Sequence, residues 1–195
     1  MRLPVLAVLL ASCAPDERDP SRRLTANVVG VLGRPAVYDE TLLVGAMVAE
    51  AGTIRTPTRS AVHLKIGSRI DVVVDLGTRA RLASLRAGGV RLVLSDGSLR
   101  VAVKSLPPGE SISVEVAGGR VGTRDAVFRV TARDDGIRSV SVLSGEVALG
   151  PSPDAPIVLA GETLRGAAKE PIDETDARAL AALVAGRPWV ARPQP

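Results

Sequence analysis

The stretch AVHLKIGSRIDVVV, residues 61–74, contains two short runs in which every second side chain is apolar. Between the two runs stands Gly67-Ser68, a pair of residues that suits a tight reversal of the chain. An alternation of period two with a β-branched face is typical of a half-buried strand. The stretch therefore predicts two strands joined by a turn. Their apolar faces are Val62, Leu64 and Ile66, and Ile70, Val72 and Val74.

The same pattern recurs through residues 27–165, where turn signals interrupt short alternating runs about every ten residues. We expect an all-β fold, with many short antiparallel-type strands in a sandwich or roll, or in a solenoid-like stack. Because no strict repeat is present, a β-helix with identical coils is not expected. The other turn signals are Gly88-Gly89, Asp96-Gly97, Pro107-Pro108-Gly109 and Asp134-Asp135-Gly136.

One short helix is predicted near the C-terminus. Residues 174–185 are rich in alanine and leucine, follow Pro171 and Asp173, and end before Gly186. The helix has one apolar stripe, so we expect it to pack as a cap on the β body; a partner-binding helix is the alternative. The stripe consists of Leu180, Leu183 and Val184.

The composition limits the core to aliphatic side chains. Hydrophobic residues make up 46% of the 195 residues, but aromatic residues make up only 2%. The 19 glycines and 14 prolines favour many turns over long helices. The length suits one domain of ordinary size. We expect a core of Val, Leu, Ile and Ala.

The charge is weakly informative about partners. The net charge is +4 and the sequence pI is about 10.0, but the arginines are scattered singly among apolar residues. Nucleic-acid binding proteins cluster their cations and interleave aromatic side chains for stacking. We therefore expect no nucleic acid as a partner and a solvated surface of mixed charge. Weak attraction to anionic lipid headgroups or to other acidic envelope polymers stays open.

A short apolar segment begins the chain. Residues 3–11 follow Arg2 and are too few to cross a bilayer as a helix, which takes about 20 residues. A charged start, a short apolar stretch and small residues are typical of a secretory signal peptide. The segment ends in Leu10-Ala11-Ser12-Cys13, which resembles the lipobox of bacterial lipoproteins. Cys13, the only cysteine, could otherwise be the small residue of an ordinary cleavage site, or a buried thiol.

The lipobox resemblance implies cleavage between Ser12 and Cys13 and acylation of Cys13, with chains such as palmitate. Ala14, rather than Asp, follows the cysteine, which resembles an outer-membrane address. We thus expect a protein held in the cell envelope by lipid, most simply at the outer membrane and facing the periplasm. The expected segments are a signal peptide (1–12), a lipidated tether (13–26), a β domain (27–168), and a helix with a proline-rich tail (169–195).

The inventory of chemically reactive groups is small. His63 is the sole histidine and lies on the polar side of its predicted strand, so we expect a surface residue. No G-x-S-x-G elbow is present, and one histidine with a lipidated cysteine cannot form the usual zinc site. We expect no catalytic residues, no metal and no cofactor.

We expect structural roles for the acidic side chains. Asp71 and Asp75 would share a strand face and could act as a glycosidase-like pair only if that face formed a cleft. Asp134-Asp135-Gly136 fits a hairpin turn without the surroundings of a calcium loop. The acidic residues before and within the helix suit its N-terminal dipole. They are Glu170, Asp173, Glu174 and Asp176.

Over residues 27–165, the order and spacing of glycine-containing segments in the β region resemble those of the FecR-type periplasmic domain. Three segments carry the resemblance, followed by the strand-like residues 140–147 and the closing Leu159-Ala160-Gly161-Glu162. These segments are residues 44–56, with Val44-Gly45 and Gly52-Thr53-Ile54-Arg55-Thr56; residues 64–70, with Ile66-Gly67-Ser68; and residues 122–130, with Gly122-Thr123 and Phe128-Arg129-Val130.

The best-known members of that family relay receptor occupancy to a cytoplasmic sigma factor, through a cytoplasmic segment and a membrane-spanning helix. A lipobox stands where both would be, so we expect that role not to transfer. What the resemblance implies is a β-rich, non-enzymatic module that binds envelope proteins. The alternatives are a cell-wall or polysaccharide-binding protein, perhaps hydrolytic, and an accessory to receptor-linked envelope signalling.

Overall fold

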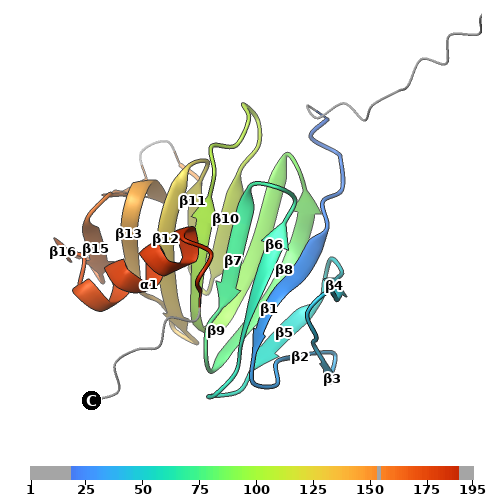
Figure 1. Cartoon of the computed structure of the whole chain (residues 1–195). Coiled ribbons are helices and arrows are strands. Elements are labelled where there is room, and N and C mark those ends of the chain that lie inside the picture. Colours follow the sequence, from blue (N-terminus) through green and yellow to red (C-terminus); the bar gives the residue numbers. More distant parts are fainter. Residues whose placement is uncertain (1–18, 153–154, 189–195) are drawn as a thin grey trace, which may run out of the picture.

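The computed structural model describes residues 19–152 and 155–188, so Ser12 and Cys13 lie outside the described residues. It consists of β-strands and one C-terminal helix, which confirms the expected fold class (Figure 1). The elements are β1 (Ala26–Leu32), β2 (Ala36–Val37), β3 (Glu40–Thr41), β4 (Met47–Val48), β5 (Thr53–Thr56), β6 (Ala61–Ile66), β7 (Ile70–Val74), β8 (Thr78–Arg86), β9 (Gly89–Val103), β10 (Ile112–Val116), β11 (Gly119–Thr123), β12 (Ala126–Arg133), β13 (Gly136–Leu149), β14 (Ile157–Leu159), β15 (Glu162–Arg165), β16 (Ala168–Pro171) and α1 (Glu174–Val184).

The strands form two layers that share β9 and β13. Sheet A has the order β3-β2-β5-β8-β9-β10-β11-β13-β14, and sheet B has the order β4-β1-β6-β7-β9-β12-β13-β15-β16. The strands β9, β10, β11, β13 and β12 close a small barrel, from which the other strands extend. The β9–β10 pair is parallel.

The long strand β9 corrects one expectation. The pair Asp96-Gly97 was expected to be a turn between two strands, but β9 continues through it from Gly89 to Val103. Gly97 has a φ of +93°, and a Cβ there would lie 2.3 Å from Oγ1 of Thr78. The left-handed residue bends the strand and lets its first half pair in sheet A and its second half in sheet B.

One core fills the space between the layers. The apolar faces predicted from the alternation point inward: Leu64, Ile66 and Val72 are fully buried. Phe128, the only phenylalanine, is among the largest fully buried side chains. The core is otherwise aliphatic, as the composition indicates. Burial of this kind contributes about 25 cal/mol per Å² of apolar surface.

The helix α1 packs on the outer face of sheet B, against β9, β12 and β13 (Figure 1). Asp173 is its N-cap and accepts a hydrogen bond from the backbone N–H of Asp176. Leu180 and Leu183 are buried as expected, but Val184 is 56% exposed and does not belong to the apolar stripe. A small second core lies beneath the helix, formed by Val73, Ala102, Val127, Leu180 and Leu183.

Within residues 19–152 and 155–188, no helix combines the length and apolar character that a membrane span requires.

Candidate functional site

Charged side chains are buried between α1 and sheet B. Arg100 on β9 donates to both carboxylate oxygens of Asp75, with Nη2 2.7 Å from Oδ1 and Nε 3.2 Å from Oδ2. Ser98 donates to the same carboxylate, 3.0 Å from Oδ2. Such a bidentate contact fixes both partners in one geometry.

A second ion pair joins the helix itself to the sheet. Nη1 of Arg129 on β12 lies 2.6 Å from Oδ1 of Asp176 on α1. Ser141 donates to the other oxygen of Asp176 at 2.7 Å, and Thr163 donates to Ser141 at 3.0 Å. Asp176 was expected only to complement the helix dipole; it is instead buried in a tertiary contact. The carboxylate of Asp176 therefore binds α1 to sheet B and also places a negative charge in the first turn of the helix.

The same network holds the end of the described chain. Nη1 of Arg100 donates to the carbonyl of Ala179 in α1 at 3.2 Å and to the carbonyl of Pro188 at 3.1 Å. Each carboxylate in the network is paired with an arginine, Asp75 with Arg100 and Asp176 with Arg129. We therefore interpret the network as a structural latch for α1, not as a catalytic centre.

His63 does not lie free on the surface, which corrects the expectation. It is 9% exposed, and its Nε2 donates to Oδ1 of Asp71 at 2.9 Å. The hydrogen bond from His63 lowers the pKa of Asp71 below its ordinary value; burial opposes this effect, and the nearby Lys65 adds to it. The pair lies on the outer face of sheet B and links the side chains of the neighbouring strands β6 and β7.

The structure does not bring Asp71 and Asp75 together as a pair of acids. Asp71 is committed to His63, and Asp75 is committed to Arg100. No group of three or more histidine, cysteine or acidic residues in the described part of the chain could hold a metal ion. Among the expected helix-start acids, Asp173 caps α1, and Glu174 pairs with Arg178 on the exposed side of the helix.

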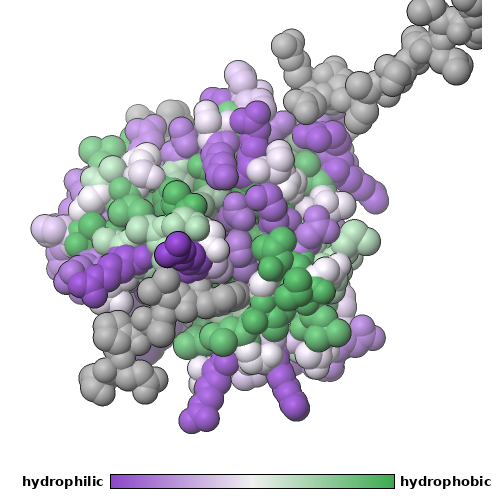
Figure 2. Space-filling model, in the orientation of Figure 1, coloured by the Kyte–Doolittle hydropathy of each residue, from purple (hydrophilic) through white to green (hydrophobic). Residues whose placement is uncertain are grey.

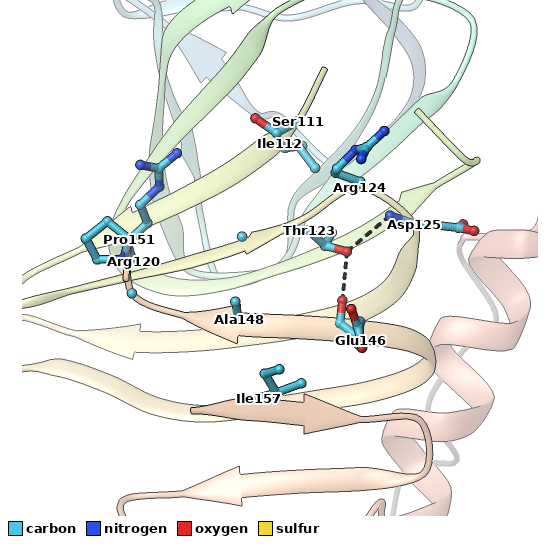
Figure 3. A pocket seen from close by; sticks show the side chains of 12 residues that line it. Ser111, Ile112, Arg120, Thr123, Arg124, Asp125, Glu146, Ala148, Pro151 and Ile157 are labelled. Carbon is cyan, nitrogen blue, oxygen red and sulfur yellow. Dashed lines mark hydrogen bonds between the residues drawn. The ribbon is translucent and has the colours of Figure 1, made fainter. Parts of the chain in front are cut away.

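An open hollow lies on the outer face of sheet A, over β10, β11, β13 and β14 (Figure 3). The hollow forms where the outward residues of the sheet are small: Gly122 and Ala148 lie opposite each other in the ladder. Arg120 and Pro151 lie at one end, and Glu146 with Thr123 lies at the other. Oγ1 of Thr123 donates to the carbonyl of Glu146 at 2.8 Å. No aromatic side chain lines this hollow, so it lacks the stacking platform that sugars favour.

An exposed apolar surface runs along β1 and the loop beside it. Leu43, Val44 and Met47 are 67%, 65% and 72% exposed. The loop is held against β1, because the N–H of Gly45 donates to the carbonyl of Val28 at 2.8 Å. Figure 2 shows hydrophobic side chains gathered over β1, away from α1. We call this surface the edge patch; it comprises Val29, Leu32, Leu43, Val44 and Met47.

Sequence reasoning missed the edge patch. Residues 42–49 form an uncharged run, LLVGAMVA, which was the available signal. In a β protein such a run is ordinarily buried, and only the fold shows that three of its large side chains face solvent. A contiguous exposed apolar surface marks an interaction site more often than isolated apolar residues do.

Comparisons with known proteins give a family for the chain and solved structures with a similar fold. A family model described as "FecR protein" matches residues 48–148, just over half of the chain. No curated protein matches the chain. Two crystal structures of a "putative anti-sigma factor" from Parabacteroides distasonis are similar, both with a TM-score of 0.54 and with 18% and 17% identity. Each match covers 69% of this chain but 65% and 64% of the solved chains, less than two thirds of their length.

Proposed function

The chain belongs to the FecR protein family, and on that premise we propose that it is a non-enzymatic protein-interaction module of the bacterial cell envelope, tethered by lipid on Cys13. FecR domains are typically periplasmic or envelope domains. The motif Leu10-Ala11-Ser12-Cys13 supports an exported chain that keeps a lipid at its processed N-terminus. Acyl chains hold a protein at a membrane when two or more are present.

The edge patch is the observation that carries the proposal. Leu43, Val44 and Met47 expose apolar surface on a domain in which Asp75 and Asp176, the acids under α1, are paired with arginines. Burying such side chains against a partner removes apolar area from water and stabilises association. The edge patch is thus the contact surface for an envelope protein.

Photo-crosslinking in the producing cells tests this function. A photoreactive phenylalanine analogue replaces Met47 in the full chain, and the matched control carries it at Arg138, an exposed position on β13. We expect a discrete crosslinked protein from position 47 and none from position 138. The double variant Leu43→Glu/Val44→Glu should abolish that product while leaving the protein level unchanged. Identical products from both positions, or a product that survives the double variant, would contradict the function.

A role in envelope signalling is the second candidate. The similar solved structures are described as those of an anti-sigma factor, and the shared feature is the fold. If this role applies, the protein crosslinked at position 47 is a receptor or a membrane regulator, and deletion of the chain changes sigma-dependent transcription. The cell-wall alternative has weaker support, since the hollow on sheet A offers no aromatic platform.

A further inference from the structure

Exposed and half-buried arginines stand on the outer face of sheet A. On β8, Ala80 and Leu82 point into the core, so Arg79 and Arg81 point outward. Arg55 on β5 lies directly opposite Arg79 in the ladder. Two further arginines stand on the same face of the sheet, Arg91 on β9 and Arg120 on β11, because their neighbours Leu92 and Val121 are buried. We call this set the arginine face: Arg55, Arg79, Arg81, Arg91 and Arg120.

The arginine face is only partly neutralised. Asp39 lies 3.7 Å from Arg55 but is 90% exposed, and Glu115 lies 3.6 Å from Arg91. Across residues 19–152 and 155–188, Arg79, Arg81 and Arg120 form no ion pair, although Asp96 is opposite Arg79 in the ladder. Arg55 and Arg79 place like charges directly opposite each other in the sheet, which disfavours the folded state. The acids Asp39, Asp96 and Glu115 offset the charge of the face only in part. This arrangement points to an anionic partner.

Sheet B shows the opposite arrangement. Its half-buried acids Asp71 and Asp75 and its buried Asp176 are each matched by a basic side chain, and α1 covers part of its outer face. On sheet A, by contrast, Arg79, Arg81 and Arg120 stand without an ion pair among the described residues. Such an asymmetry orients a protein toward a negatively charged surface.

The tether leaves the domain from sheet A. The N–H of Gly88, in the turn between β8 and β9, donates to the carbonyl of Pro20 at 2.9 Å, and Arg86 donates to the carbonyl of Ser21 at 3.3 Å. From Asp19 back to Cys13 the chain advances six residues, which span at most about 20 Å. A lipid on Cys13 would hold this end of sheet A within that distance of the membrane surface.

We infer that the arginine face docks on anionic lipid headgroups and orients the domain on the membrane that carries its anchor. This inference rests on the proposed lipid tether. Guanidinium groups bind phosphate oxygens through paired hydrogen bonds, and the outer face of sheet A presents several of them. The attraction acts within about 8 Å at physiological salt, so it requires the close approach that a short tether provides.

Vesicle co-sedimentation of the full chain with Cys13→Ser tests the docking without acylation. The vesicles are phosphatidylcholine alone or with about 30 mol% phosphatidylglycerol. At about 50 mM salt we expect about tenfold stronger binding to the anionic vesicles, and little difference at about 500 mM. The variant Arg79→Gln/Arg81→Gln/Arg120→Gln should lose most of that difference. Its matched control, Arg133→Gln/Arg138→Gln/Arg178→Gln, changes net charge equally and should bind like the parent.

The docking would be overturned by equal binding to both kinds of vesicle or by an equal loss of binding in both triple variants. Full displacement of the protein from the vesicles by soluble poly-glutamate at matched charge would also overturn it, because it would indicate an acidic protein as the partner instead. Circular dichroism melting curves check that each variant folds. Palmitate labelling of the wild-type chain separates the two proposals, because a labelled Cys13 with no preference for anionic vesicles leaves the tether intact and removes the docking alone.

Discussion

Arg129 on β12 and Asp176 on α1 form a largely buried ion pair, with Nη1 2.6 Å from Oδ1, across the junction between the sheet and the helix. The pair joins residues 47 positions apart in the sequence. It is supported by Ser141 and Thr163 on the side of Asp176, and by Ser98 and Asp75 on the side of Arg129. The position of α1 is therefore defined by directional contacts as well as by the apolar residues Leu180 and Leu183.

Removing one partner of this pair should destabilise the whole domain. The Asp176→Ala variant leaves the half-buried charge of Arg129 with only the longer contact to Asp75 at 3.7 Å, and it removes the acceptor of Ser141, so we expect a loss on the order of 3 kcal/mol. Urea denaturation at neutral pH measures it. The control Glu174→Ala removes an exposed pair with Arg178 on the same helix and should cost less than about 1 kcal/mol. Equal losses in the two variants would show that the latch carries no special weight.

The bend in β9 should tolerate no side chain. A Cβ at Gly97 would lie 2.6 Å from Cα of Thr78, and the residue has a φ of +93°. We expect Gly97→Ala to cost about 3 kcal/mol or more, from the clash and the backbone strain together. Gly118→Ala is the control: it has a φ of +70° but no atom within 4 Å, so only the strain of about 1 kcal/mol applies. Thermal melting of the two variants compares these costs; a mild Gly97→Ala would mean that β9 can relax around the bend.

Acid should weaken the protein partly through Asp71. Its folded-state pKa is lowered by the hydrogen bond from His63, so the stabilisation is complete above the ordinary aspartate value, near pH 4. It is lost as pH falls through the lower folded-state pKa. We therefore expect the free energy of unfolding of wild type to fall more between about pH 5 and about pH 2 than that of Asp71→Asn. The exposed Asp39→Asn serves as control and should follow wild type. Parallel curves for all three proteins would remove the His63–Asp71 pair from the acid response.

Glu162 should protect one edge of sheet A. Its Oε2 accepts the backbone N–H of Leu159 on the edge strand β14 at 2.9 Å and is held by Lys169. The hydrogen bond from Leu159 lowers the pKa of Glu162. Free N–H groups on edge strands pair with other chains. We expect Glu162→Ala to increase self-association, measured by light scattering at increasing concentration, whereas Glu170→Ala should not. Unchanged scattering would show that β14 needs no such cap.

Local patterns predicted much of the fold. The alternation in residues 61–74 and the helix signals around Asp173 and Gly186 correspond to β6, β7 and α1. The same local signals could not separate a turn from a bend: Asp96-Gly97 permits both, and pairing of β9 with β8, β7 and β12 decides between them. Pairing also decides what surrounds a polar residue, which is why the burial of His63 and the tertiary role of Asp176 were missed.

The candidate site was less predictable than the fold. Sequence reasoning concentrated on acids and on the lone histidine, which the structure places in structural pairs. The edge patch and the arginine face depend on which residues of distant strands share one face, as Arg55 and Arg79 do. Such neighbours follow from register and topology. The proposed tether at Cys13 lies outside the described residues and stays a prediction from the lipobox alone.

Mass spectrometry of the mature protein, with metabolic palmitate labelling, tests the tethered-module account most directly. We predict an N-terminus at Cys13 that carries acyl chains and a protein that sediments with the membrane fraction. In the Cys13→Ser variant both the label and the membrane association should be lost, while the crosslinking surface stays folded. An unlabelled wild-type protein, or one whose N-terminus begins elsewhere without lipid, would contradict the account.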